Sequence, residues 1–90
     1  MNDVKSFELV RKITDHKDGN TLQWGPTFYV STKHEAIQQI WSDLERLIHS
    51  DIDDDKQFKV SFDTNDITAS YTFIELGRPS TITWRLESRN

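Results

Sequence analysis

A single stretch of this chain has the apolar spacing of a helix, and alternating segments typical of strands lie on both sides of it. Across residues 33–50 the apolar side chains recur at intervals of three and four, within an arc of about 140° on a helical wheel. They are Ala36, Ile37, Ile40, Trp41, Leu44, Leu47 and Ile48. Thr32 and Glu35 have the spacing of a capping box, which predicts that the helix begins after Thr32. Asp51 would fall inside the apolar arc, so we expect the helix to end by Ser50.

Two alternating segments precede this helix and predict a β-hairpin. Residues 6–14 and 21–31 alternate, with Phe7, Leu9 and Ile13 on one face of the first segment and Leu22, Trp24, Phe28 and Val30 on one face of the second. Asp18-Gly19 between the two segments is a dipeptide favoured in type I′ turns. Folding the chain about this dipeptide gives three apolar pairs: Phe7 with Val30, Leu9 with Phe28, and Ile13 with Trp24. Gly25-Pro26 interrupts the second strand, and we expect a bulge or an edge there because proline cannot donate a ladder hydrogen bond.

Three more alternating segments follow the helix, at residues 57–63, 67–76 and 80–87. A turn around Thr64-Asn65 would oppose Phe62 to Ile67, Val60 to Ala69 and Phe58 to Tyr71. A turn at residues 77–80 would oppose Phe73 to Trp84 and Tyr71 to Leu86. The other face of these strands is dominated by Thr, Ser and charged residues and should be solvated, with Val10, Tyr29 and Ile74 as its apolar exceptions.

The order of these elements predicts a single α+β domain over residues 1–90, with the sequence ββαβββ. One amphipathic helix should pack on one face of a mostly antiparallel, strongly curved five-stranded sheet. All three tryptophans are in phase with the core, and we expect Trp41 at the centre of the helix–sheet interface. A helix about 10–12 Å across cannot cover a sheet about 20–25 Å wide. Either the sheet curls tightly around Trp41, or its aromatic face meets another chain, or the shorter hairpin folds over as a second layer.

The composition excludes several classes of protein. There is no cysteine, which rules out disulfides and thiolate chemistry. No segment approaches the roughly 20 apolar residues of a membrane span, and the first residues lack the apolar run of a signal peptide. We therefore expect a cytoplasmic protein that does not bind membranes. The net charge of −4 is opposite to the clustered positive charge of most proteins that follow a phosphate backbone, so we expect no direct nucleic-acid binding.

The negative charge is concentrated in residues 51–66, which sum to −4 while the rest of the chain is balanced. The acids of this window are Asp51, Asp53, Asp54, Asp55, Asp63 and Asp66. The first three ligand positions of a calcium loop are matched, but Lys56 stands at the turn position that requires Gly and Phe62 at the position of the final Glu. We therefore expect an acidic surface without a bound metal.

No stretch has the spacing of a catalytic or cofactor motif, because the three glycines lie far apart and the histidines lack the spacing of a helical zinc site. We therefore expect a non-catalytic interaction protein without a cofactor, of the inhibitor, immunity or adaptor kind. Its partner would be another protein, foremost a basic one, because negative charge steers association with basic partners. A homodimer is a further option. The alternative is a small enzyme or ligand-binding domain that uses the concave face of the sheet.

Overall fold

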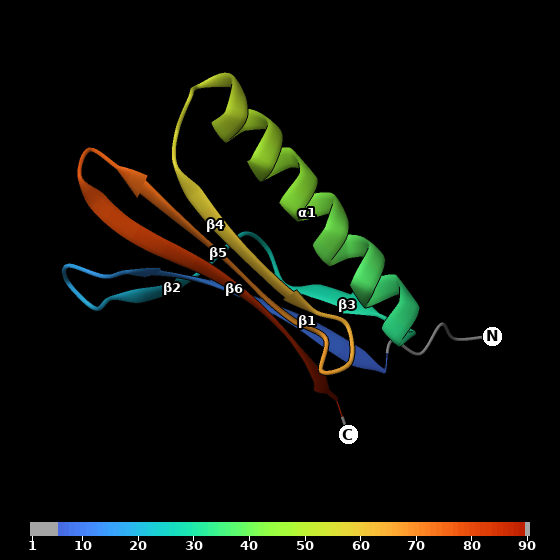
Figure 1. Ribbon diagram of the computed structural model, residues 1–90. Helices are drawn as coiled ribbons and strands as arrows, with labels where there is room; N and C mark the ends of the chain where they lie inside the picture. The colour runs from blue at the N-terminus through green and yellow to red at the C-terminus, as the bar shows by residue number, and fades with distance from the viewer. Residues whose placement is uncertain (1–5, 90) are drawn as a thin grey trace.

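The computed structural model describes residues 6–89 and places one α-helix against one face of a six-stranded antiparallel sheet (Figure 1). The elements are β1 (Phe7–Asp15), β2 (Thr21–Gln23), β3 (Phe28–Val30), α1 (Lys33–Asp53), β4 (Phe58–Asp63), β5 (Thr68–Glu75) and β6 (Arg78–Ser88). The α+β class and the order of the elements are as predicted. The strand count is six and not five because the second strand breaks at Gly25-Pro26 into β2 and β3, which both pair with β1.

The sheet has the order β2–β1–β6–β5–β4, and β3 lies beside β1. Its centre is the long antiparallel pair of β1 and β6, the first and last strands in the chain. Their pairing runs from Phe7 opposite Ser88 to Asp15 opposite Ser80. β4 is the last strand on the other side and follows directly after α1 in the chain. Within the described residues, α1 is not apolar enough along its length to cross a membrane.

The first hairpin confirms the predicted register near its open end and departs from it near its turn. Phe7 pairs with Val30 and Leu9 with Phe28, as predicted. Beyond the bulge the register is displaced by two residues, so Ile13 pairs with Leu22 and the predicted Ile13–Trp24 pair is wrong. The turn is also longer than a two-residue type I′ turn, since the Asp15 amide donates to the Asn20 carbonyl (3.0 Å). Gly19 alone in this loop has a positive φ, of 71°.

The other two hairpins show the same kind of correction. In β4–β5, Phe62 lies opposite Ala69 and not Ile67, because Ile67 is in the left-handed region (φ 55°) and belongs to the turn. In β5–β6, the turn is the two-residue Leu76-Gly77, with φ values of 54° and 76°, so Tyr71 pairs with Ile82 and Ala69 with Trp84. The displacements are by two and four residues. They leave each apolar side chain on its predicted face, because the side chains of a strand alternate with a period of two.

The helix begins as predicted and ends later. The Glu35 amide donates to the Thr32 hydroxyl (3.1 Å), which is the expected N-cap. The helix then continues past Ser50 to Asp53, so the predicted end is wrong. Asp51 occupies the apolar side of the last turn because its carboxylate accepts a hydrogen bond from the Tyr71 hydroxyl. A specific partner on the sheet thus allows a charged residue where the apolar pattern argued against one.

The core lies between α1 and the inward face of β1, β5 and β6. Its fully covered side chains include Leu9, Ile40, Leu44, Tyr71 and Trp84. Trp41 does not belong to this core, since 54% of it is exposed, and its predicted place at the centre of the interface is wrong. The sheet remains open and is not curled tightly around this tryptophan. The domain is elongated, 49 × 26 × 22 Å, and Figure 1 shows the β1–β2 and β5–β6 ends extending beyond the helix.

Candidate functional site

Two charged side chains are buried between α1 and the sheet. Asp43 is fully buried and Arg11 nearly so, and the Asp43 Oδ2 and Arg11 Nη1 atoms lie 3.3 Å apart. The same carboxylate accepts hydrogen bonds from Trp84 Nε1 (3.0 Å), Gln39 Nε2 (2.9 Å) and Arg46 Nη2 (2.8 Å). The four donors satisfy both carboxylate oxygens, which offsets the cost of removing this charge from water.

The other side of the Arg11 guanidinium explains the break between β2 and β3. Its Nη2 donates to the Pro26 carbonyl (2.9 Å), and a Cβ added to Gly25 would lie 3.3 Å from the same nitrogen. The guanidinium carbon also lies 5.5 Å from the centre of the Trp24 ring and 5.4 Å from that of Phe28, within the range of cation–π attraction. The bulge therefore wraps around a buried cation, and glycine at position 25 allows the close approach.

The buried pair also determines which side of α1 faces the sheet. At 100° per residue, Asp43 lies about 20° outside one limit of the predicted apolar arc, whereas Trp41 lies at the opposite limit. Burying Asp43 against Arg11 rotates the helix so that Trp41 turns outward. Sequence reasoning missed both charged residues, although Arg11 alternates in phase with the inward-facing Leu9 and Ile13. Because the carboxylate is closed off and saturated with donors, we assign the pair a structural role.

The structure divides the predicted acidic surface into two groups. Asp53, Asp54 and Asp55 are exposed where α1 ends, whereas Asp63 and Asp66 are exposed at the turn between β4 and β5. The six residues of β4 separate the groups by about 20 Å. The first group lies at the negative end of the helix dipole, and no basic residue is present in the last turn of α1, which is fully described. This arrangement is electrostatically unfavourable for the isolated helix.

The sixth acid, Asp51, is turned away from this surface. Its Oδ2 accepts the short hydrogen bond from Tyr71, whose hydroxyl also donates to the Leu47 carbonyl (3.2 Å). Burial and the neighbouring carboxylate raise the pKa of Tyr71 well above its ordinary value, because both disfavour the phenolate. Asp51 therefore holds the last turn of α1 on the sheet and is only half exposed to solvent.

An apolar surface lies between these two acidic groups, where α1 runs beside the edge of the sheet. The rings of Trp41 and Phe62 stack with centroids 6.2 Å apart and planes inclined by 27°. Val60 is 41% exposed on β4, and Ile52 is 62% exposed three turns along the helix from Trp41. We refer to these four residues, Trp41, Ile52, Val60 and Phe62, as the β4-edge surface. It adjoins a strand that, within residues 6–89, is hydrogen-bonded on one side only, to β5.

The residues that could support catalysis or metal binding are dispersed. Across residues 6–89, no group of three His, Asp or Glu side chains is placed to hold a metal ion. His16 lies in the β1–β2 turn, whereas His34 and His49 lie near opposite ends of α1. Comparisons with protein-family models, with curated proteins and with solved structures give no match to this chain.

Proposed function

We propose that this protein is a non-catalytic interaction protein that binds another protein through the β4-edge surface. The observation that carries the proposal is the half-exposed Trp41 stacked on Phe62 at the border of the core. Tryptophan is enriched among the residues that dominate binding energy at protein interfaces. Exposed apolar side chains that adjoin one another, with charged groups around them, mark interaction sites on soluble domains.

The unpaired side of β4 gives this surface a second means of binding. An extended segment of a partner can add to a sheet edge, where main-chain hydrogen bonds supply affinity and alternate side chains supply specificity. Such a segment, paired along the six residues of β4, would direct every second side chain toward Val60 and Phe62. The β4 edge carries no proline to block such pairing.

The charges at the two ends of β4 indicate the chemistry of this segment. Acids stand before the strand at Asp53–Asp55 and after it at Asp63 and Asp66. A partner segment with apolar residues at alternate positions and Lys or Arg at both ends would match this arrangement. Electrostatic complementarity of this kind raises the association rate and rejects wrong partners.

The same charges argue against pairing of β4 with a second copy of the chain. Because directly opposite residues of an antiparallel pair share one face, two copies of β4 must pair about a single residue, and a pair centred on Val60 would place Asp54 of each copy opposite Asp66 of the other. Like charges directly opposite one another destabilise a strand pair. Natural proteins use charged residues at exposed edges to prevent such self-association. We therefore favour a basic partner protein over a homodimer.

The test is affinity capture from the native cell, with the unaltered protein and its variants as separate baits. Quantitative mass spectrometry then compares the proteins that each bait retains. A true partner should be retained by the unaltered protein and reduced by both Trp41→Ala and Val60→Lys. For a purified partner, Trp41→Ala should raise the Kd roughly thirtyfold or more, corresponding to a loss of at least about 2 kcal/mol at an interface hot spot.

The control is Tyr29→Ala, which removes another exposed aromatic side chain, on β3 at the far end of the sheet. It should leave binding unchanged, and circular dichroism should show that all three variants remain folded. Binding that survives both β4-edge changes, or that is lost on Tyr29→Ala instead, would refute the proposed surface.

A further inference from the structure

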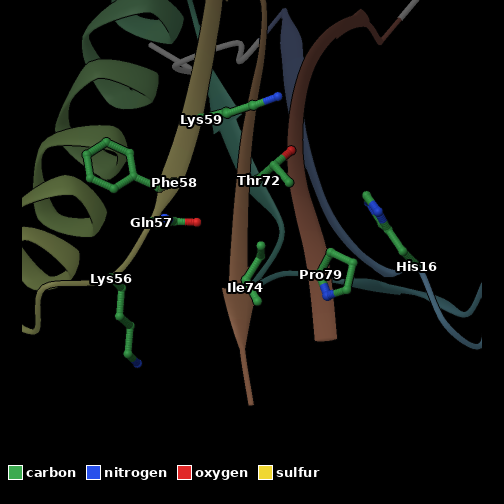
Figure 2. A pocket seen from close by; sticks show the side chains of 8 residues that line it. All are labelled: His16, Lys56, Gln57, Phe58, Lys59, Thr72, Ile74 and Pro79. Atoms are coloured by element: carbon green, nitrogen blue, oxygen red, sulfur yellow. The ribbon is translucent and has the colours of Figure 1, made fainter. Parts of the chain in front are cut away.

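The face of the sheet opposite α1 holds a cavity of about 590 Å³, shown in Figure 2. It is lined by His16, Lys56, Gln57, Phe58, Lys59, Thr72, Ile74 and Pro79. These residues come from the segment that enters β4 and the start of β4, from β5, from the start of β6 and from the β1–β2 turn. A volume of this size falls within the range of small-molecule sites. The cavity shares β4 with the β4-edge surface but lies on the other face of the sheet from the side chains of that surface, and the inference below does not rest on the proposed protein-binding function.

The floor of the cavity is apolar. Ile74 is 45% exposed, and its cross-strand neighbour is Pro79. Ile74 is one of the few apolar side chains on a face that is otherwise rich in threonine and charge. Figure 2 shows Ile74 and Pro79 side by side between β4 and the β1–β2 turn. A ligand with an apolar body would cover this exposed hydrocarbon and gain the free energy of its removal from water.

The polar groups around this floor are cationic or neutral. None of the eight described residues that line the cavity is acidic, although the chain has a net charge of −4. Lys59 reaches over the cavity from β4, and His16 stands on the far side beyond Pro79, whereas Lys56 extends away (Figure 2). An anionic group near Thr72 would therefore meet Lys59 from one direction, and none of the described lining side chains would repel it.

Two hydrogen bonds link His16, Thr81 and Thr72, and one of their proton arrangements directs a further donor into the cavity. His16 Nε2 lies 2.7 Å from Thr81 Oγ1, which lies 2.9 Å from Thr72 Oγ1. Each hydroxyl has one proton to donate. When His16 donates to Thr81 and Thr81 donates to Thr72, the proton of Thr72 is left to point into the cavity that this residue lines. An acceptor such as a carboxylate oxygen would complete the chain.

We propose that this cavity binds a small carboxylate with an apolar body. Lys59 and the Thr72 hydroxyl hold the carboxylate, and the apolar body lies on Ile74 and Pro79. A phosphate or nucleotide fits less well, because no arginine lines the cavity among the described residues and the chain has no glycine-rich loop to supply backbone amides.

The test is a titration of the full chain with octanoate, with 1-octanol and octylamine as ligands of equal length and different charge. Chemical shifts of the backbone amides should change saturably for Thr72, Ile74 and Lys59 on addition of octanoate, and much less with either control ligand. Lys59→Gln should weaken octanoate binding about threefold to tenfold, as loss of a charge-assisted hydrogen bond at a half-open site. Thr72→Val keeps the branched shape and removes the hydroxyl, and it should weaken binding about threefold or more.

The matched control is Lys12→Gln, which removes a lysine from the same face of the sheet at a position that does not line this cavity. It should bind octanoate as tightly as the unaltered chain. Equal binding of octanoate and octanol would refute the anion site. Shifts confined to other residues, no saturable shift, or an equal loss of affinity in Lys12→Gln would likewise overturn the proposal. Thermal melts of each variant would identify any loss of affinity that comes from unfolding.

Discussion

Replacement of Asp43 by alanine should be the most destabilising single change that removes no large apolar side chain. The substitution leaves the Arg11 guanidinium buried without its counter-charge and the Trp84 Nε1 proton without an acceptor. Removal of one member of a buried ion pair costs about 3–5 kcal/mol. A domain of this length has a total stability of about 5–14 kcal/mol, so the variant would lose a substantial fraction of it. Gln39 and the largely exposed Arg46 can turn to water and add little to the loss.

The measurement is urea unfolding, followed by circular dichroism and by tryptophan fluorescence. Arg46→Gln is the matched control, since it removes a donor to the same carboxylate from a side chain that is 71% exposed, and it should cost less than about 1 kcal/mol. The double variant Arg11→Met/Asp43→Leu replaces both charges by apolar side chains. It should recover most of the loss, because buried ion pairs are often no more stabilising than a packed apolar pair.

Two results would refute this reasoning. A cost below about 1 kcal/mol for Asp43→Ala would mean that water enters and solvates Arg11, so that the pair is not closed off. A double variant as unstable as Asp43→Ala would mean that the pair contributes through geometry that apolar side chains cannot replace, and that the penalty does not arise from an unpaired buried cation.

Three further predictions concern the first turn, the alkaline stability and the acids at the end of α1. Gly19→Val should lower the free energy of unfolding by more than about 1 kcal/mol because φ is +71°, and Gly19→Asn should cost less; equal urea midpoints would contradict the strain. Burial and a neighbouring carboxylate raise the pKa of Tyr71 above its ordinary value near 10, so its contribution to stability is present below pH 10 and is lost as the pH rises further. Tyr71→Phe should remove that part of the alkaline decline in urea midpoints, and an unchanged decline would disprove the assignment. Changing Asp53, Asp54 and Asp55 to Asn should leave stability nearly unchanged or slightly higher, and should slow association with a captured basic partner by a factor that shrinks with salt. Association that is unaffected at low salt would count against a role for these acids in binding.

The apolar pattern of the sequence determined which face of each strand is buried. This result is independent of register: the predicted pairs beyond the first bulge were displaced by two residues, and those of the last hairpin by four. An even displacement leaves inward side chains inward. The register itself was decided by turn geometry, such as the left-handed φ of Ile67 and of Leu76, residue types for which this region is uncommon. Side-chain type alone does not indicate such a conformation.

Only the tertiary structure decided how α1 is rotated on the sheet. Both the predicted apolar arc and the observed buried side include Ile40 and Leu44, but they differ at their limits. Hydrophobicity alone predicts that Trp41 is buried and that Asp43 is exposed, because an isolated buried carboxylate is costly. That cost is offset only when Arg11 and the Trp84 indole face the carboxylate, and they reach it through the pairing of β1 with β6, residues far apart in the chain. The exposed tryptophan of the candidate site is therefore a consequence of a buried charge pair, which depends on contacts that no local stretch of sequence contains.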